Sequence, residues 1–298
     1  MIKYLKLIRN NLFLLLSKLF AIINHFIPLK SANKFGAILA AIVYLFIKKK
    51  YVSTAISNLK LIYPEKSNSE IRKLTFKVFL NQGKNLFEVL QFYKLNKENI
   101  KNYVKIVGKE YLDSALKKNK GVLYIASHFG NWELMGVALS LYGYKLNVVA
   151  RKVNFDKLDN MILDIRTSKG LKIFQRNEKD TVRKILTALH KNEIVALLID
   201  QNIKSIPGIY VNFFNHKAYS PIGLALLALK TSAPVIAGYI VREKDATHTL
   251  TILPEIEIIR TGNHQEDVKL NTQHFNDIIE SYIRKYPEQW VWIHERWS

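Results

Sequence analysis

The sequence predicts an α/β fold in which a mixed, largely parallel central sheet is flanked by helices. From residue 104 onward, short apolar runs alternate with stretches of helical spacing, which is typical of βαβ units. The runs are apolar on both faces, as in buried parallel strands. With 298 residues, 49% of them hydrophobic, the chain is long enough for one large domain and an N-terminal appendage.

The segment Ser53–Leu95, before this alternation, is predicted to be helical. Pro64 interrupts the pattern, and Ser67 or Ser69 is expected to cap the helix that follows. That helix carries one apolar stripe, so we expect it to pack on the domain that comes next. Glu88 lies on the same helix and is expected to be solvated or ion-paired.

The alternating part of the chain divides into seven strands and six helices. Strands are predicted at Val104–Val107, Gly121–Ala126, Lys145–Ala150, Leu171–Phe174, Ile194–Ile199, Pro234–Val241 and Thr247–Ile258, the last of them antiparallel. Helices are predicted at Lys109–Lys118, Trp132–Tyr142, Asp156–Ser168, Asp180–His190, Pro221–Lys230 and Gln265–Lys285.

The composition points to an anionic partner. Net charge is +21, from 45 Lys and Arg against 24 Asp and Glu. Nucleic acid, acidic phospholipid, phosphorylated glycolipid and an acidic carrier protein all fit this charge. The chain has no cysteine, which excludes disulfides, thiolate catalysis and cysteine-based zinc sites.

The N-terminus is basic and apolar, with no acidic residue before Glu65. Basic residues flank two apolar stretches, Leu12–Ile27 and Phe35–Ile47. We expect residues 1–50 to associate with a membrane, as a helical hairpin or as one marginal span plus an interfacial helix. Lys48 to Lys50 would face anionic headgroups. A basic soluble cap is the alternative; a signal peptide is disfavoured because basic residues recur after the apolar run.

The stretch GVLYIASHFGNWELMG, residues 121–136, carries the main candidate site. A buried strand ends here in a polar turn, and a helix resumes at Trp132. His128 therefore sits at the carboxyl edge of the sheet, where open α/β sheets bind ligands. Glu133 falls in the first turn of the helix, where the helix dipole favours a carboxylate. The same dipole disfavours an imidazolium, so His128 is expected to stay neutral and available as a base.

Polar residues follow other predicted strands as well. Arg151 comes after one strand, while Asp200, Gln201 and Asn202 come after another. Arg166 lies at the end of a helix. These side chains can converge with His128 on one edge of the sheet. The alternatives are surface salt bridges for the arginines and a loop cap for Asp200.

The sequence motifs of several enzyme classes are absent. The chain contains no GxSxG elbow, no Walker A loop, no GxGxxG and no HExxH, and its eight histidines show no ligand spacing, so no metal site is expected. A histidine and a carboxylate without a nucleophile remain. This pair suits a base that removes a proton from a substrate hydroxyl while the carboxylate orients the imidazole.

His128 to Glu133 read HFGNWE, an HxxxxE motif that resembles the lipid A biosynthesis (Kdo2-lipid A late) acyltransferases. The mycobacterial phosphatidylinositol mannoside acyltransferases are similar. Further blocks agree with this family: NLKLIYPEKSNSEI (58–71), LLIDQN (197–202), GIYVNFFNHKAYSPIGLALLALKTSAPVI (208–236) and YPEQWVWIHERW (286–297).

The resemblance implies a glycerol-3-phosphate acyltransferase-like fold, with residues 51–298 as the acyltransferase domain. It implies acyl transfer from an acyl thioester, usually on acyl carrier protein, to a hydroxyl of an anionic membrane lipid or phosphorylated glycolipid such as a lipid A precursor. No cofactor is expected. The protein would act at the bacterial inner membrane, with the catalytic domain facing the cytoplasm.

The resemblance also assigns roles. His128 would be the general base and Glu133 its partner. Asp200 stands where related acyltransferases hold a glutamate. The residues expected to bind substrate are Arg151, Arg166, Asp200, Gln201 and Asn131, with Arg176 a weaker candidate. Trp290, Trp292 and Trp297 are expected to be interfacial or packing residues.

Three alternatives stay open. A lysophospholipid or phosphatidylinositol mannoside-type acyltransferase would use the same base, although lysophosphatidic acid acyltransferases usually carry HxxxxD and a Pro-Glu-Gly block, both absent here. A non-catalytic lipid-binding protein would keep the fold without needing the His–Glu pair. A nucleic-acid-binding protein would explain the charge, but the basic residues flank apolar stretches rather than a recognition helix.

Overall fold

The computed structural model describes residues 26–46, 49–152, 156–176 and 178–297. Within these ranges, seven strands form a sheet in the order β1-β9-β8-β2-β5-β3-β4, and β6 pairs with β7 in a separate hairpin. Neighbours in the sheet are parallel except β8 and β9. The predicted mixed, largely parallel sheet is therefore confirmed.

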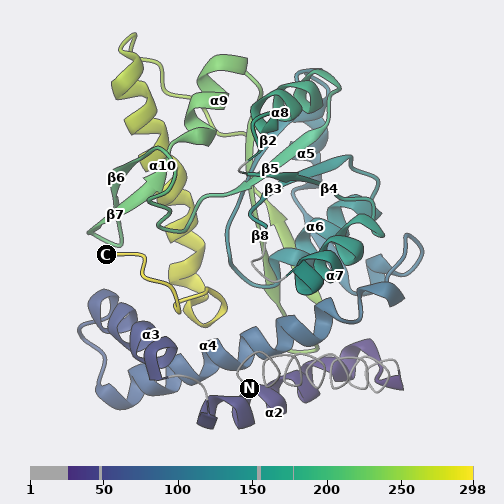
Figure 1. Cartoon of the computed structure of the whole chain (residues 1–298), viewed down its shortest axis with the longest axis vertical. Helices are drawn as coiled ribbons and strands as arrows, with labels where there is room; N and C mark the ends of the chain where they lie inside the picture. The colour runs from purple at the N-terminus through teal and green to yellow at the C-terminus, as the bar shows by residue number, and fades with distance from the viewer. Residues whose placement is uncertain (1–25, 47–48, 153–155, 177, 298) are drawn as a thin grey trace, which may run out of the picture.

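The elements alternate along the chain as the sequence predicts (Figure 1). The strands are β1 (Val104–Val107), β2 (Val122–Ala126), β3 (Leu146–Ala150), β4 (Lys172–Gln175), β5 (Ile194–Leu198), β6 (Gly208–Phe213), β7 (His216–Pro221), β8 (Val235–Arg242) and β9 (His248–Ile252). The helices are α2 (Leu29–Phe46), α3 (Lys49–Ile62), α4 (Asn68–Val89), α5 (Lys109–Leu116), α6 (Trp132–Leu141), α7 (Asp156–Thr167), α8 (Thr181–His190), α9 (Gly223–Thr231) and α10 (His264–Lys285). Short 3-10 turns lie at Phe92–Lys94, Ile100–Asn102 and Pro287–Gln289.

The sheet buries a separate apolar core on each face. Side chains alternate along every strand, so Tyr124 and Ala126 of β2 join the core under α5 and α6. Leu123 and Ile125 join the core under α8, α9 and α10. Because both faces are covered, the strands are apolar throughout their length.

Helix α4 runs along the lower side of the molecule in Figure 1, with α2 beside it. Ser67 caps α4 and exchanges hydrogen bonds with Glu70, a capping box that confirms the predicted start of this helix. Gly36 of α2 and Gly83 of α4 let the two backbones meet, since a Cβ on Gly83 would lie 2.5 Å from the Gly36 carbonyl oxygen. The face of α4 that meets the core carries the predicted apolar stripe, including Ile71 and Val78.

Within the described ranges, the helices are all too short or too polar to cross a bilayer. Of the apolar stretch Phe35–Ile47, residues 35–46 belong to α2. The stretch Leu12–Ile27 lies almost entirely outside the described residues.

The β6–β7 hairpin was not among the predicted elements, although its residues fall in a recognised block. Its two-residue loop is Phe214-Asn215, with both residues at positive φ (56° and 63°). That geometry is a type I′ turn, whose usual sequence signal is Asn-Gly or Asp-Gly. The last predicted strand, Thr247–Ile258, is also shorter than expected: β9 ends at Ile252, and it is antiparallel to β8 as predicted.

Candidate active site

The imidazole of His128 is held by the carboxylate of Asp200. His128 Nδ1 lies 2.9 Å from Asp200 Oδ1, and the His128 backbone N–H donates to Oδ2 at 2.8 Å. The sheet register brings them together: Ala126 pairs with Leu198 on the neighbouring parallel strand, so the residues two positions further along both strands are also neighbours. The structure thus places at the carboxyl edge of β2 and β5 a contact that spans 72 residues of sequence.

The predicted partner of His128, Glu133, is engaged elsewhere. Its carboxylate accepts two hydrogen bonds from Arg166, at 2.9 Å from Nε and 2.5 Å from Nη2. The expectation that Glu133 orients the imidazole is therefore corrected: in the described part of the chain, Asp200 holds the imidazole of His128. Glu133 lies in the first turn of helix α6, and its carboxylate faces Arg166 in the last turn of α7.

Asp200 is buried and stays ionised. Burial alone would raise its pKa, but the His128 charge and hydrogen bond, together with the Trp290 N–H, lower the pKa overall. An ionised carboxylate only accepts hydrogen bonds, so His128 donates from Nδ1, and in the neutral imidazole the lone pair is then on Nε2. This tautomer is the one that a general base needs.

The C-terminal segment braces this contact. Trp290 donates its indole N–H to Asp200 Oδ2 at 2.8 Å. Val291 N–H donates to the His128 carbonyl, and Gly130 N–H donates to the Gln289 carbonyl at 2.8 Å. Trp290 and Trp292 are fully buried. These residues were expected to be interfacial or packing residues, and the structure shows that Trp290 and Trp292 pack in the core. Sequence reasoning did not identify the bond from Trp290 to Asp200, because 90 residues separate the two.

The turn between β2 and α6 needs glycine at one position. Gly130 has φ of +56°, and a Cβ there would lie 1.8 Å from the Ile240 carbonyl oxygen. Asn131 follows, and its side chain caps α6 by accepting from the Leu134 N–H at 3.0 Å. The middle of the HFGNWE motif is therefore explained by backbone geometry.

A buried ion pair supports this turn from below. Glu88 of α4 accepts two hydrogen bonds from Arg242 of β8, at 3.0 and 2.8 Å, and one from Asn131 at 2.6 Å. Asn85 of α4 donates to the Gly130 carbonyl at 2.7 Å. Burial alone would raise the pKa of Glu88, but the charge of Arg242 lowers it overall. Of the two expectations for Glu88, ion pairing is confirmed, but its contact with the turn between β2 and α6 is evident only from the tertiary structure.

A cavity of about 460 Å³ opens beside His128. It lies between the β2-β5-β3 part of the sheet and helix α6, and we call it the His128 cavity. The part under α6 is apolar, and the part at the strand ends is polar. The apolar lining includes Tyr124, Met135, Gly136, Leu139, Leu146, Val148 and Leu171. The polar lining includes His128, Glu133, Arg151, Arg166, Arg176, Gln201 and Asn202.

Most of the residues predicted to bind substrate therefore line one cavity. Arg151, Arg166 and Gln201 border it, as the sheet-edge argument expects. Asn131 is 1% exposed, and its amide is used in the helix cap and the bond to Glu88. Asp200 is 0% exposed and contacts the Nδ1 side of the His128 imidazole. The geometry suggests no direct substrate contact for these last two residues.

The arrangement suits one kind of chemistry. A neutral imidazole held by a buried carboxylate can take a proton from a hydroxyl group. Ser127, next to the histidine, is 2% exposed and shares a hydrogen bond of 2.6 Å with Tyr282, so it is not presented as a nucleophile. Among the described residues, no group of three His, Cys, Asp or Glu side chains could hold a metal ion.

The chain thus combines an α/β fold with a histidine that follows a buried strand and borders a partly apolar cavity. The model of the bacterial lipid A biosynthesis acyltransferase family matches residues 2–298, so the chain belongs to that family and is an acyltransferase. The recognition made from the HFGNWE motif and the further blocks is confirmed.

Curated relatives agree with this assignment. The lipid A biosynthesis palmitoleoyltransferase of Escherichia coli (strain K12) is 26% identical over 265 residues, which cover 88% of this chain and 83% of the relative. The lipid A biosynthesis lauroyltransferase of the same strain is 23% identical over 281 residues, covering 91% and 87%. The phosphatidylinositol mannoside acyltransferase of Mycobacterium tuberculosis (strain ATCC 25618 / H37Rv) is 24% identical over 194 residues, covering 64% and 59%.

Proposed function

We propose that this acyltransferase moves a fatty acyl chain from an acyl thioester to a hydroxyl group of a lipid A precursor or a similar phosphorylated glycolipid. One observation carries the proposal. His128, held at Nδ1 by Asp200, borders a cavity whose inner part is apolar and whose mouth carries arginines. An apolar chain, a thioester carbonyl and an anionic acceptor each find a matching surface in that arrangement.

In the proposed reaction, the acceptor hydroxyl approaches Nε2 of His128. The imidazole takes the hydroxyl proton while the oxygen attacks the thioester carbonyl carbon. Asp200 stabilises the imidazolium that forms, because its carboxylate is ionised and lies 2.9 Å from Nδ1. Water has little access to this carboxylate, which keeps the interaction strong.

The attack produces a tetrahedral intermediate with a negative oxygen. The start of helix α6 at Trp132 lies one turn from His128, and its backbone N–H groups and dipole can stabilise that charge. Collapse of the intermediate forms the new ester and breaks the carbon–sulfur bond. The imidazolium then returns its proton to the departing thiolate.

Glu133 and Arg166 are proposed to organise the polar end of the cavity. Burial alone would lower the pKa of Arg166, but the two hydrogen bonds and the charge of Glu133 raise it. The guanidinium is thus held charged and in a fixed direction beside the reacting groups. Arg151, with Gln201, is proposed to bind the acceptor.

The donor is proposed to be acyl carrier protein. Such carriers are acidic, and the chain has a net charge of +21. Coenzyme A is the alternative donor, and it would use the same carbonyl chemistry. The two donors are distinguished by measuring transfer rates with each at increasing salt concentration. Salt screens the attraction between the basic enzyme surface and an acidic carrier protein, so the rate with acyl carrier protein should fall more steeply.

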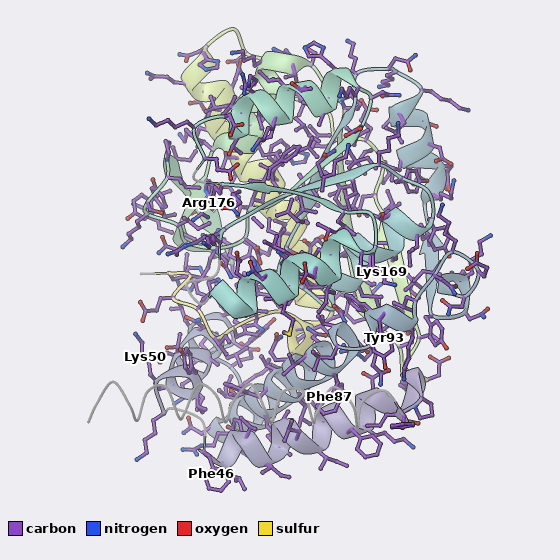
Figure 2. The ribbon with its side chains drawn as sticks, turned by 45° about the vertical axis from the view of Figure 1, so that its right-hand side comes forward. Phe46, Lys50, Phe87, Tyr93, Lys169 and Arg176 are labelled. Carbon is purple, nitrogen blue, oxygen red and sulfur yellow. The ribbon has the colours of Figure 1, made fainter. Side chains whose placement is uncertain are left out.

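We propose that residues 1–50 attach the enzyme to the inner membrane, with residues 51–298 on its cytoplasmic side. Helix α2 packs on α4 through one face and leaves an apolar stripe exposed on another. The stripe consists of Phe35, Ile38, Ile42, Leu45 and Phe46, with Phe46 82% exposed. Lys49 and Lys50 follow at the start of α3, and Figure 2 shows Phe46 at the lower edge of the molecule with Lys50 above it. This pattern suits an interfacial helix facing anionic lipid.

The activity is tested with His128→Ala. The purified enzyme is given acyl carrier protein or coenzyme A thioesters and a lipid A precursor, and the product is read by mass spectrometry. The variant should lose turnover by ~10²–10⁴-fold, with donor binding retained, because the base is gone and the cavity remains. Turnover near that of the wild type would overturn the assignment.

The same assay addresses the alternatives. A non-catalytic lipid-binding protein would bind the precursor and show no transfer with either donor. A phosphatidylinositol mannoside in place of the lipid A precursor tests the acceptor class of the mycobacterial relatives. Membrane attachment is tested by vesicle co-sedimentation of Ile38→Glu/Ile42→Glu, which should bind anionic vesicles more weakly than the wild type.

A further inference from the structure

A second cavity of about 430 Å³ lies on the opposite face of the sheet from His128. It is enclosed by β5, α8, α9 and the segment before β6, and we call it the α8/α9 cavity. Its lining is mostly aliphatic, including Ile185, Ile199, Ile206, Leu224 and Leu227. His128 does not border it. The mechanism described above makes no use of this space.

Side-chain alternation explains why the two cavities are separate. On β3, Val148 faces the His128 cavity, while Val149 borders both. On β5, Ala196 borders the His128 cavity, Leu197 borders the other, and Leu198 at the end of the strand borders both. The sheet thus separates two spaces of similar volume up to the strand ends, each in the range of small-molecule sites.

The two cavities share a rim at the carboxyl ends of β3 and β4. Arg151 and Arg176 border both of them. Ala150 pairs with Gln175, and the Arg176 N–H donates to the Ala150 carbonyl at 2.9 Å, so the two arginines follow neighbouring strand ends. Arg176, labelled in Figure 2, lies at the end of β4.

This rim has the character of an anion site. Neither Arg151 nor Arg176 makes an ion pair with another described residue, and Nε of Arg176 is buried without a hydrogen-bond partner. Burial, followed by the charge of Arg151, lowers the pKa of Arg176. Glu178 also lines the α8/α9 cavity, but its carboxylate pairs with Lys184 at 2.6 Å. Two guanidiniums that have no acidic partner among the described residues suit a phosphate group.

We propose that the α8/α9 cavity binds an acyl chain already present on the acceptor glycolipid, while a phosphate of the same molecule binds Arg151 and Arg176. This inference rests on the proposed function. The donor chain must enter beside His128, because its carbonyl carbon is attacked there. An acceptor chain is attached at another position of the glycolipid and can occupy a space that His128 does not border. The shared arginine rim joins the two sites.

The test uses a tryptophan that fills the cavity. Leu227→Trp on α9 occupies the α8/α9 cavity, and Leu186→Trp on α8 is the matched control, since Leu186 is half-buried and does not border the cavity. A second filling variant, Val182→Trp, starts from a side chain that is 59% exposed at the rim, so it is compatible with folding. Thermal unfolding checks that all three fold.

Two probes are compared: a phosphorylated lipid A precursor, and the same molecule after removal of its ester-linked acyl chains. Leu227→Trp and Val182→Trp should bind the acylated probe at least tenfold more weakly than the wild type and raise its KM to the same degree. Their affinity for the deacylated probe, the KM for the donor and the preferred donor chain length should be unchanged. Leu186→Trp should match the wild type throughout.

The rim is tested separately with Arg176→Gln. This variant should weaken binding of both probes alike, because both retain their phosphates. Removing the phosphates with a phosphatase should abolish the difference between Arg176→Gln and the wild type. An effect of Arg176→Gln that persists on the dephosphorylated probe would overturn the assignment of the rim.

The outcomes separate this inference from the proposed function. A change in donor KM or donor chain length in Leu227→Trp would assign the α8/α9 cavity to the donor and overturn the inference. Equally weakened binding of the acylated and deacylated probes by Leu227→Trp would also overturn the inference. Because equilibrium binding needs no turnover, absence of acyl transfer by the wild type would refute the proposed function alone. Transfer with unchanged binding in both filling variants would refute only the second site.

Discussion

Asp200 and Glu133, the two carboxylates near the turn between β2 and α6, differ in burial and in hydrogen-bond partner. Asp200 is 0% exposed and holds His128 and Trp290. Glu133, whose side chain is 19% exposed, borders the cavity and holds Arg166. Glu133 is five residues from His128 in sequence, and Asp200 is 72 residues away. The distant residue contacts the imidazole.

The difference shows how the Asp200–His128 contact and the Glu133–Arg166 contact are each positioned. The contact between His128 and Asp200 follows from strand register, because the two residues come two positions after the paired residues Ala126 and Leu198. The Glu133 cluster is fixed by the position of helix α6, which rests on the Asn131 cap and the Glu88–Arg242 pair. Asp200 is thus suited to orient the base, and Glu133 to orient a cation at the cavity.

The largest effect should come from Asp200→Asn. The amide keeps the shape but loses the charge, and its NH2 can face Nδ1 and impose the wrong tautomer on His128. We expect kcat to fall by ~10²–10⁴-fold with little change in donor KM. Steady-state kinetics on an acyl thioester measures this.

Unfolding experiments serve as the control for that variant, because Trp290 and the His128 N–H lose part of their partner as well. If Asp200→Asn kept at least a third of wild-type kcat while Glu133→Gln lost it, Glu133 would be the functional partner of the base after all.

The next effect concerns stability on the Glu133 side. Glu88→Gln leaves the Arg242 guanidinium buried without its counter-charge, and breaking such a pair costs about 3–5 kcal/mol. Urea unfolding monitored by tryptophan fluorescence gives the free energy of unfolding. Glu70→Gln, on the exposed first turn of the same helix, retains the capping geometry and should unfold close to the wild type. Equal losses in both variants would contradict the importance of the buried pair.

A pH effect is expected on the Asp200 side. Burial, only partly offset by the charge of Asp200, lowers the pKa of His294 from 6.5 to about 4. Between these two values the unfolded chain binds a proton that the folded chain does not, so the free energy of unfolding should decrease as pH falls from 6.5 to 4. The loss is on the order of 3 kcal/mol and is absent above pH 6.5.

His294→Gln removes that titration. Urea unfolding at pH 7 and pH 4.5 should therefore show a smaller difference for the variant than for the wild type. An identical pH dependence in the two proteins would show that other groups cause it.

The smallest effect should come from Glu133→Gln. The amide oxygen still accepts from Arg166, so only the charge-assisted part of the contact is lost. We expect about a tenfold fall in kcat/KM, equivalent to about 1.4 kcal/mol. Arg166→Lys replaces the two-pronged contact by a point charge and should behave similarly, with the double variant no worse than either single one. Fully additive losses would show that the two residues act separately.

Much of the fold could be predicted because its signals are local. Strand β1 was predicted residue for residue at Val104–Val107, and Ser67, one of the two residues expected to cap the following helix, does cap it. The β6–β7 hairpin was missed because its turn, Phe214-Asn215, begins with a phenylalanine, a residue that rarely adopts positive φ. Arg242 and Trp290 could not be assigned to the site, because an arginine in a strand and a tryptophan near the C-terminus carry no local sign of their partners.

The sequence by itself determined that a histidine lies between a buried strand and a helix, and that an arginine and an aspartate each follow another strand. Apolar runs, caps and turns depend on interactions between residues a few positions apart, so they can be predicted from the sequence alone. Only the tertiary structure decided which carboxylate meets His128. The order of strands in a sheet is set by packing both of its faces at once, and that order placed β5, with Asp200, beside β2.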